Sequence, residues 1–439
     1  MKTLRELGEA YALGATGPVE QTEAFFAVAR PGPVFAALTP ERATPAARAA
    51  AERWRMGRPL GPLDGVVVAV KDLLDLKGHV TAAGSAVLAR LRRPAPADAP
   101  AVRNLERAGA VIAAKTQLNE LAFSGLGLNP HFGTPQNALN PDWVPGGSSS
   151  GSAVAVATGL APLAVGSDTG GSVRIPAAFN GLVGFKPTNG RIPTEGITPL
   201  SPTLDTVGPI APDVADAWAL FRALAGEAPA PLAPHEGPAR LLVPEEPLER
   251  SQPEVRRPVL DALDELAAAG FEVHMAKVPE LAEVYRLYRE LGPLAAHEAL
   301  ALYRDLVEEH GTAMDPRVVA RILDVAGRDP LDYRRLLAER ARRIPAFWER
   351  YAGFDALALP TVPVLPPRLR EVEASDEAFF AANNRVLAHT MLFNFYAGPA
   401  VSLPVGVGVG LMLASRPGSD AELFSLSLRA EALLGGSGR

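Results

Sequence analysis

Two clusters of glycine and serine lie close together in the sequence, GGSSSGS at residues 146–152 and GSDTGGS at residues 166–172. Each is followed by a short helical pattern. Glycine-rich turns that lead into helices gather backbone N–H groups at the positive end of the helix dipole, and such groups hold an anion. Two flexible linkers are the alternative, but linkers do not alternate with apolar helix and strand segments. The clusters therefore predict a site for a phosphate or for a transient oxyanion.

A phosphate site is the less favoured of the two. The sequence has no GxxxxGK[ST] motif, and no GxGxxG motif follows its first strand pattern with an acidic residue downstream. This leaves an oxyanion hole, in which N–H donors stabilise the tetrahedral intermediate that forms when a serine attacks a carbonyl group.

One candidate nucleophile is Ser149, because residues 147–151 match the GxSxG elbow of α/β-hydrolases. That elbow needs a strand leading into it and a histidine downstream. The residues before it, NPDWVPGG, do not have a strand pattern, and among the seven histidines His389 is the possible partner. The motif alone is therefore weak.

The second route to a reactive serine is a lysine base. Lys71 follows a buried strand pattern at residues 66–70 and ends the run VVVAVK. An exposed lysine has a pKa of about 10.4 and is protonated at neutral pH, but desolvation in an apolar setting lowers that value. An ion pair of Lys71 with Asp72 or Asp75 at the strand end explains the spacing equally well.

Several segments resemble the amidase signature family. They are GGSSSGSA at 146–153, GSDTGGSVRIPA at 166–177, FNGLVGFKPTNGRIP at 179–193, the surroundings of Lys71, GAVIAAKTQLNELAF at 109–123, GPAVSLP at 398–404 and GLMLASRPG at 410–418. The resemblance covers most of the chain. It implies an α/β fold in which helices cover both faces of a large mixed, mostly parallel β-sheet. It also implies hydrolysis of a carboxylic acid amide through an acyl-enzyme.

The resemblance further implies a serine–serine–lysine triad. Ser172 would be the nucleophile, Ser148 the bridging serine with a cis peptide before it, and Lys71 the base. The oxyanion hole would be formed by the backbone N–H groups of Thr169, Gly170, Gly171 and Ser172. Three further residues would support the site, namely Ser149, Asp168 and Arg174.

The acyl pocket is less well defined by the sequence. Four apolar or aromatic candidates for its walls, which could equally be core residues, are Leu126, Phe132, Phe393 and Tyr396. Arg317 and Arg321 lie one turn apart on a helical pattern. They are either an anchor for a substrate carboxylate or part of a solvated face.

An alternative within the family is the A subunit of glutamyl-tRNA amidotransferase, which acts with partner subunits. That subunit usually has KTNMDEF where this chain has KTQLNEL at 115–121, and it has an aspartate near the position of Leu387. Both departures favour a stand-alone amidase. A scaffold that kept the fold but lost activity is a further alternative, although all three triad positions are occupied.

The elements that must position these residues form one domain over residues 1–439. We expect a helical N-terminal segment at 1–60, a core at 61–215 with alternating strands and helices, a mainly helical insertion at 246–350, and closing strands with a terminal helix at 354–439. Within the insertion, the helical pattern at 282–309 predicts one long helix. Alternation of helices and strands predicts a layered α/β fold.

Composition limits the remaining possibilities. A net charge of −6 argues against a general nucleic-acid or membrane-surface binder, and the absence of cysteine excludes thiolate chemistry. The uncharged stretches at 143–167 and 386–415 are interrupted by glycine or proline and do not indicate membrane spans. We therefore expect a cytoplasmic enzyme that needs no metal or other cofactor and takes a small-molecule amide. Homodimer formation is left open.

Overall fold

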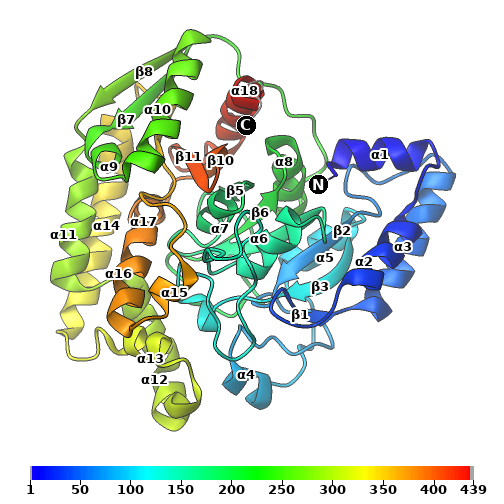
Figure 1. Ribbon diagram of the computed structural model, residues 1–439, viewed down its shortest axis with the longest axis horizontal. Helices are drawn as coiled ribbons and strands as arrows, with labels where there is room; N and C mark the ends of the chain where they lie inside the picture. The colour runs from blue at the N-terminus through cyan, green and yellow to red at the C-terminus, as the bar shows by residue number, and fades with distance from the viewer. Residues whose placement is uncertain (1, 436–439) are drawn as a thin grey trace.

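The computed structural model describes residues 2–435 and is built around one large β-sheet (Figure 1). The 11 strands of these residues are ordered β1-β3-β2-β4-β6-β5-β10-β11-β9-β7-β8 across the sheet. In chain order they are β1 (Phe35–Leu38), β2 (Val67–Lys71), β3 (Val111–Thr116), β4 (Leu163–Asp168), β5 (Val183–Lys186), β6 (Thr206–Ala211), β7 (Ala239–Pro244), β8 (Phe271–Ala276), β9 (Ala356–Pro360), β10 (Ala400–Gly406) and β11 (Val409–Ala414).

Pairing in this sheet is mixed, as predicted, but parallel pairs do not predominate. Among the described strands four pairs are parallel, namely β2–β3, β2–β4, β7–β8 and β7–β9. Six are antiparallel: β1–β3 and the five pairs that run from β4 across to β9. Alternating helices and strands imply parallel crossovers. The sheet departs from this pattern because β6 lies antiparallel between β4 and β5, and because β10 and β11 pair antiparallel with each other and with their neighbours.

The helices vary in length from single turns to long rods. In chain order they are α1 (Leu4–Ala12), α2 (Pro18–Val28), α3 (Pro40–Arg55), α4 (Ala86–Leu91), α5 (Pro100–Arg107), α6 (Ser150–Ala157), α7 (Arg174–Phe179), α8 (Val214–Leu224), α9 (Glu245–Glu249), α10 (Pro253–Ala268), α11 (Pro279–Leu291), α12 (Leu294–His310), α13 (Pro316–Leu323), α14 (Pro330–Arg350), α15 (Leu369–Val372), α16 (Asp376–Leu387), α17 (Thr390–Phe395) and α18 (Asp420–Leu434). Short 3₁₀ helices span Glu120–Ala122 and Gly311–Ala313.

Helices pack on both faces of the sheet, and the side chains of β2 show how. Val68 and Val70 belong to a core cluster with residues of α5 and α8, whereas Val67 and Ala69 belong to a second cluster with residues of α3 and α6. Successive side chains of a strand point to opposite faces, so a strand buried on both faces is an unbroken apolar run. Lys71 therefore shares its face with Val67 and Ala69, on the side of α6.

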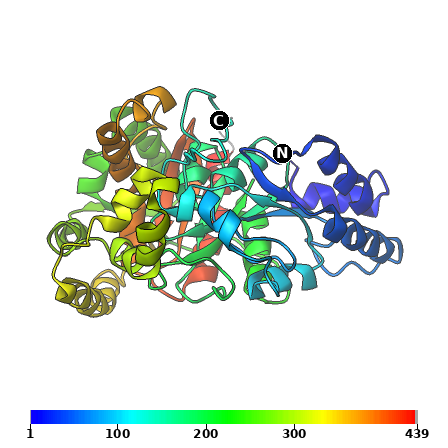
Figure 2. The same cartoon turned by 90° about the horizontal axis from the view of Figure 1, so that it is seen from below.

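The helical region from α11 to α14 lies at one end of the molecule and the helices α1 to α3 lie at the other (Figures 1 and 2). The helix predicted at 282–309 is in fact two helices, α11 and α12. Gly292 between them has a φ of +84°, and Pro293 follows it without an N–H group for a helical hydrogen bond. No helix among residues 2–435 combines the length and the apolar composition needed to cross a bilayer.

Candidate active site

Lys71 is the last residue of β2, and its side chain is fully buried. Its Nζ donates hydrogen bonds to Ser148 Oγ at 2.7 Å and to Ser167 Oγ at 2.8 Å. Asp72, the next residue, forms an ion pair with Lys115 at 2.6 Å instead. Because no carboxylate of the described residues lies within ion-pair distance of Lys71, the alternative of a strand-end ion pair is wrong.

Burial lowers the pKa of Lys71 to about 7, although the negative charges of Asp168 and Asp205 act in the opposite direction. Removing an ammonium group from water disfavours its charged form, and hydroxyl partners do not offset this loss as a carboxylate would. An amine with a pKa near 7 is largely neutral above neutral pH. It can then accept a proton, as a general base must.

The two serines before α6 have different surroundings. Ser148 follows a cis peptide bond from Gly147 and is fully buried beside Lys71, as the resemblance implied. Ser149 Oγ donates to the carbonyl of Ser167 and accepts from its N–H group, both at 3.3 Å. Ser149 therefore attaches the loop to β4, as expected for a residue that supports the site rather than reacts.

The structure offers no support for Ser149 as the nucleophile of a GxSxG elbow. Residues 140–147 contain no strand. His389, the possible partner, is buried with Nδ1 bonded to the carbonyl of Pro360 at 2.8 Å. Burial also lowers the pKa of His389 to about 4.

Ser172 lies in the loop between β4 and α7 and is 4% exposed at the wall of a cavity. Its carbonyl accepts a hydrogen bond from the N–H group of Ser149 at 3.2 Å, so its backbone contacts the residue next to Ser148. Among the described residues no hydrogen bond joins the hydroxyls of Ser148 and Ser172. The structure thus brings three predicted residues to one place, with the Lys71–Ser148 link formed and the Ser148–Ser172 link open.

The loop after β4 presents Thr169, Gly170 and Ser172 to the cavity, but not Gly171. The N–H group of Gly171 donates to Asp168 Oδ1 at 2.8 Å. Of the four predicted oxyanion donors, Gly171 is therefore the one whose N–H is turned to a carboxylate. A side chain at Gly171 would also be excluded, because its Cβ would lie 2.1 Å from Thr390 Oγ1.

Asp168 and Arg174 form a fully buried ion pair at the base of this loop. Arg174 donates from Nε at 3.0 Å and from Nη2 at 2.9 Å, and Asn394 Nδ2 donates to the same carboxylate at 2.8 Å. Burial alone would raise the pKa of Asp168, but the charge and hydrogen bonds of Arg174, with Asn394, hold it at about 2. The ionised carboxylate then fixes the N–H groups of Gly171 and Val173.

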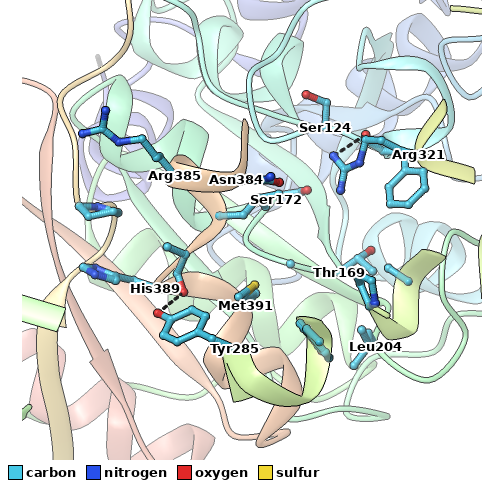
Figure 3. Close-up of a pocket in the computed structure, with 18 of the residues that line it drawn as sticks. Ser124, Thr169, Ser172, Leu204, Tyr285, Arg321, Asn384, Arg385, His389 and Met391 are labelled. Carbon is cyan, nitrogen blue, oxygen red and sulfur yellow. Dashed lines mark hydrogen bonds between the residues drawn. The ribbon is translucent and has the colours of Figure 1, made fainter. Parts of the chain in front are cut away.

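The cavity beside Ser172 has a volume of about 630 Å³ (Figure 3). Its walls come from residues 122–124, the loop after β4, α11 and the region from α16 to α17. Apolar and aromatic side chains predominate, and they include Phe123, Leu204, Leu281, Tyr285, Tyr288, Leu387 and Met391. A cavity of this size and lining suits a small organic ligand.

None of the four predicted pocket residues lines this cavity. Leu126, Phe393 and Tyr396 are completely buried in the core, where the ring of Tyr396 stacks on Phe347 at 3.9 Å between centroids. Phe132 is partly exposed, in a loop outside the cavity. Aromatic residues next to a predicted site are as often core as pocket, and sequence alone does not separate the two.

The two candidate arginines have different surroundings. Arg321 lines the cavity, where its Nη1 donates to the carbonyl of Phe123 at 2.9 Å and its guanidinium lies 4.3 Å from the centre of that ring. No carboxylate of the described residues lies within ion-pair distance of Arg321, and burial lowers its pKa to about 10. Arg317 points elsewhere and pairs with Asp376 at 2.9 Å. Only Arg321 is placed to meet a ligand.

Comparison with known proteins agrees with this geometry. A sequence profile described as Amidase matches residues 27–424. The chain belongs to the amidase signature family. Relatives of this amidase include 2-amino-5-chloromuconic acid deaminase of Comamonas testosteroni, 37% identical over 90% of this chain and 87% of the relative. Mandelamide hydrolase of Pseudomonas putida is 33% identical over 86% of this chain and 80% of the relative.

A solved structure described as an amidase superposes on this amidase with a TM-score of 0.87 at 36% identity, covering 98% of this chain and 99% of the other. The protein is therefore a hydrolase that acts on amide C–N bonds. The A subunit of glutamyl-tRNA(Gln) amidotransferase of Chloroflexus aurantiacus is also similar, at 33% identity over 94% of this chain and 93% of the relative.

Three residues at the site were missed by sequence reasoning: Ser167, Asp205 and Asn394. Ser167 is brought to Lys71 by strand pairing, because β4 pairs with β2 in parallel with Val70 opposite Val165. That register brings the residue after Val70 close to the residues that follow Val165. Asn394 comes from α17, more than 200 residues further along the chain, and no local pattern connects it with Asp168.

Proposed function

We propose that this amidase forms an acyl-enzyme on Ser172, with Ser148 as the bridging hydroxyl and Lys71 as the base. The observation that carries the proposal is the environment of Lys71. Its amine is fully buried, bonded to two serine hydroxyls, and has a pKa lowered to about 7. A lysine without water or a carboxylate beside it is easily deprotonated. Its amine contacts the hydroxyl of Ser148, and the next residue, Ser149, is bonded to the backbone of Ser172 at the cavity wall.

In the proposed reaction Lys71 takes the proton of Ser148, which takes that of Ser172 as the latter attacks the amide carbonyl. The N–H groups of Thr169, Gly170 and Ser172 stabilise the tetrahedral oxyanion, a contribution of about 10²–10³ in rate for each donor. The proton returns through Ser148 to the departing nitrogen, because an amine leaves poorly unless it is protonated. Water then hydrolyses the ester on Ser172 and releases the carboxylate.

The acyl group of the substrate is proposed to be apolar or aromatic, with an anionic substituent that reaches Arg321. Apolar and aromatic side chains make up most of the cavity wall, and Arg321 supplies a cation without a carboxylate partner among residues 2–435. The names of two relatives each match one part of this proposal, since one acts on a muconic acid, which is anionic, and the other on mandelamide, which is aromatic and neutral.

The A subunit of an amidotransferase is the second candidate, supported by the similarity to the Chloroflexus aurantiacus protein. The cavity argues for a stand-alone amidase instead. Leu387 lies in the cavity wall near the position where the sequence comparison expects an aspartate in that subunit. A leucine there offers no charge to the amino group of glutamine.

The test is a screen for ammonia release from neutral aromatic amides, monoamides of dicarboxylic acids, and glutamine, with Ser172→Ala as the control. A serine-reactive phosphonate followed by peptide mass spectrometry locates the nucleophile. We expect a label on Ser172 and turnover that Ser172→Ala abolishes. A label on Ser149, or turnover that survives in Ser172→Ala, would overturn the proposal. Release of ammonia from glutamine alone would favour the amidotransferase.

A further inference from the structure

Asp205 is a carboxylate at the site that the proposed mechanism does not use. Its Oδ1 accepts a hydrogen bond from Thr169 Oγ1 at 2.5 Å. Its Oδ2 accepts hydrogen bonds from the N–H groups of Leu200 and Ser201, at 2.9 and 3.0 Å. One side chain thus ties the loop that carries Ser172 to the turn at residues 200–205.

That turn is part of the cavity, since Leu200 and Leu204 line it together with Thr169. It is secured from the other side by Glu298 of α12. Glu298 Oε2 accepts hydrogen bonds from Ser201 Oγ at 2.5 Å and from the N–H group of Thr203 at 3.1 Å. The turn is therefore held between two carboxylates, and Asp205 is the one that faces the reacting groups.

Asp205 also lies close to the reactive end of Lys71. A small cavity of about 10 Å³ is lined by Ser167, Thr169 and Asp205 among others. Ser167 Oγ is one of the two acceptors of Lys71 Nζ. Ser167 is thus a neighbour of both the amine and the carboxylate, and the charge of Asp205 favours the protonated amine.

We propose that Asp205 is a positioning residue, which holds Thr169 in the oxyanion loop and, from beside Ser167, favours the protonated form of Lys71. The inference rests on the proposed function, because it requires Lys71 to be the base. Two other groups face Asp205 from α12, Glu298 and Tyr303. Asp168 is the second carboxylate that acts on Lys71. These groups must be kept when Asp205 is tested.

The test is the pH profile of kcat/KM for Asp205→Asn. Removing the negative charge makes Lys71 easier to deprotonate, so the acid limb should move to lower pH by about 0.5–1 unit, at the lower end of what a nearby carboxylate causes. The NH2 group of asparagine replaces one of the two acceptor oxygens, so the bonds from Thr169 and from the N–H groups of Leu200 and Ser201 cannot all be kept. The weaker hold on Thr169 should lower kcat about tenfold or more, with a smaller effect on KM. An acid limb that stays in place would overturn the assignment.

The matched control is Glu298→Gln, which removes the carboxylate that holds the same turn from α12 and whose charge is not among those that act on Lys71. It should leave the acid limb unmoved. An equal shift of the acid limb in Glu298→Gln would show that the effect on Lys71 is not specific to the charge of Asp205, and it would overturn the assignment.

If Asp205→Asn does not fold, as judged by circular dichroism, Thr169→Val decides instead. It removes the hydroxyl donor and keeps the charge of Asp205, so kcat should fall while the acid limb stays in place. An unchanged kcat overturns the inference. Phosphonate labelling separates the two proposals: an unlabelled Ser172 in the unaltered enzyme contradicts the mechanism, whereas normal labelling with an unmoved acid limb contradicts only the role of Asp205.

Discussion

Lys71 shows how a single side chain can be turned from a cation into a base. Its amine has hydroxyl partners at 2.7 and 2.8 Å, and burial removes the water that would stabilise the charge. With a pKa of about 7, the neutral form is lost as the pH falls below that value. We therefore expect kcat/KM to decline about tenfold per pH unit below pH 7.

Lys71→Ala should lower amide hydrolysis by at least about 10²-fold, since general base catalysis alone contributes ~10²–10⁴. Ammonia release over pH 5 to 10 gives the rate, and circular dichroism checks that the variant folds. A folded Lys71→Ala enzyme with substantial turnover would contradict the assignment of the base.

Substrate recognition can be tested at Arg321 with Arg317 as the control position, because of these two arginines only Arg321 lines the cavity. Arg321→Gln should lower kcat/KM for amides that carry a distant carboxylate by roughly 10- to 100-fold, the contribution of a hydrogen bond to a charged group. Neutral amides should be affected much less. The measurement is kcat/KM for a matched neutral and anionic pair, with Arg317→Gln as the control that should leave the ratio unchanged.

At this scale the sequence predicts reactive groups better than their partners. Lys71, Ser148 and Ser172 are found because their segments have distinctive compositions and resemble a known family. The prediction of pocket residues was wrong for Leu126, Phe393 and Tyr396, which lie in the core. An apolar or aromatic residue in a core differs from one in a pocket only in what tertiary packing places beside it. Ser167 required the register of β2 on β4, which follows only once the strands are paired.

At the scale of elements, the pair of Asp168 with Arg174 holds the end of β4 to α7, and Asn394 adds α17. Asp168→Asn would leave Arg174 charged and fully buried without its partner, which costs about 3–5 kcal/mol of unfolding free energy. The pKa of Asp168 is near 2, below the ordinary value of an aspartate. The pair therefore contributes its full share to the free energy of unfolding above that ordinary value, and this contribution is lost as the pH falls towards 2.

Urea unfolding of Asp168→Asn at neutral pH measures this cost. The matched control is Asp261→Asn, which removes an exposed pair with Arg257 on α10 and should cost less than about 1 kcal/mol. Similar losses in both variants would show that burial of the pair at Asp168 contributes little.

Elements with a strong local pattern were predicted from sequence, and those set by tertiary pairing were not. β2 was found because its apolar run is bounded by polar residues on both sides. β6 and β7 were missed, although both are almost wholly buried, because prolines within them weaken the strand pattern. The break between α11 and α12 was missed because apolar residues keep helical spacing across Gly292 and Pro293.

At the scale of the whole molecule, helices from distant parts of the chain meet through carboxylates. The N–H group of Leu4 at the start of α1 donates to Asp216 of α8, and that of Val214 donates to Glu431 of α18 at 3.0 Å. Burial, with the nearby charges of Asp213 and Asp216, raises the pKa of Glu431 to about 8. The folded state therefore binds a proton that the unfolded state releases between about pH 4.5 and 8.

Stability should fall as the pH rises through this window, because the folded form holds the extra proton. Glu431→Gln removes that dependence, so the variant should be more stable than the unaltered protein at pH 9 and closer to it at pH 5. Thermal unfolding across this range tests the prediction. Glu422→Gln, on the exposed face of the same helix, should show no such trend.

The groups assigned to bond breaking all come from residues 71–205, whereas much of the cavity wall comes from residues 281–391. Chemistry and selectivity are thus encoded in separate stretches of one polypeptide. Exchange of the second stretch is therefore expected to change which amide is accepted more than it changes the groups that cleave it. Chimaeras that join the first stretch of this protein to the second stretch of a relative offer a direct route to new substrates.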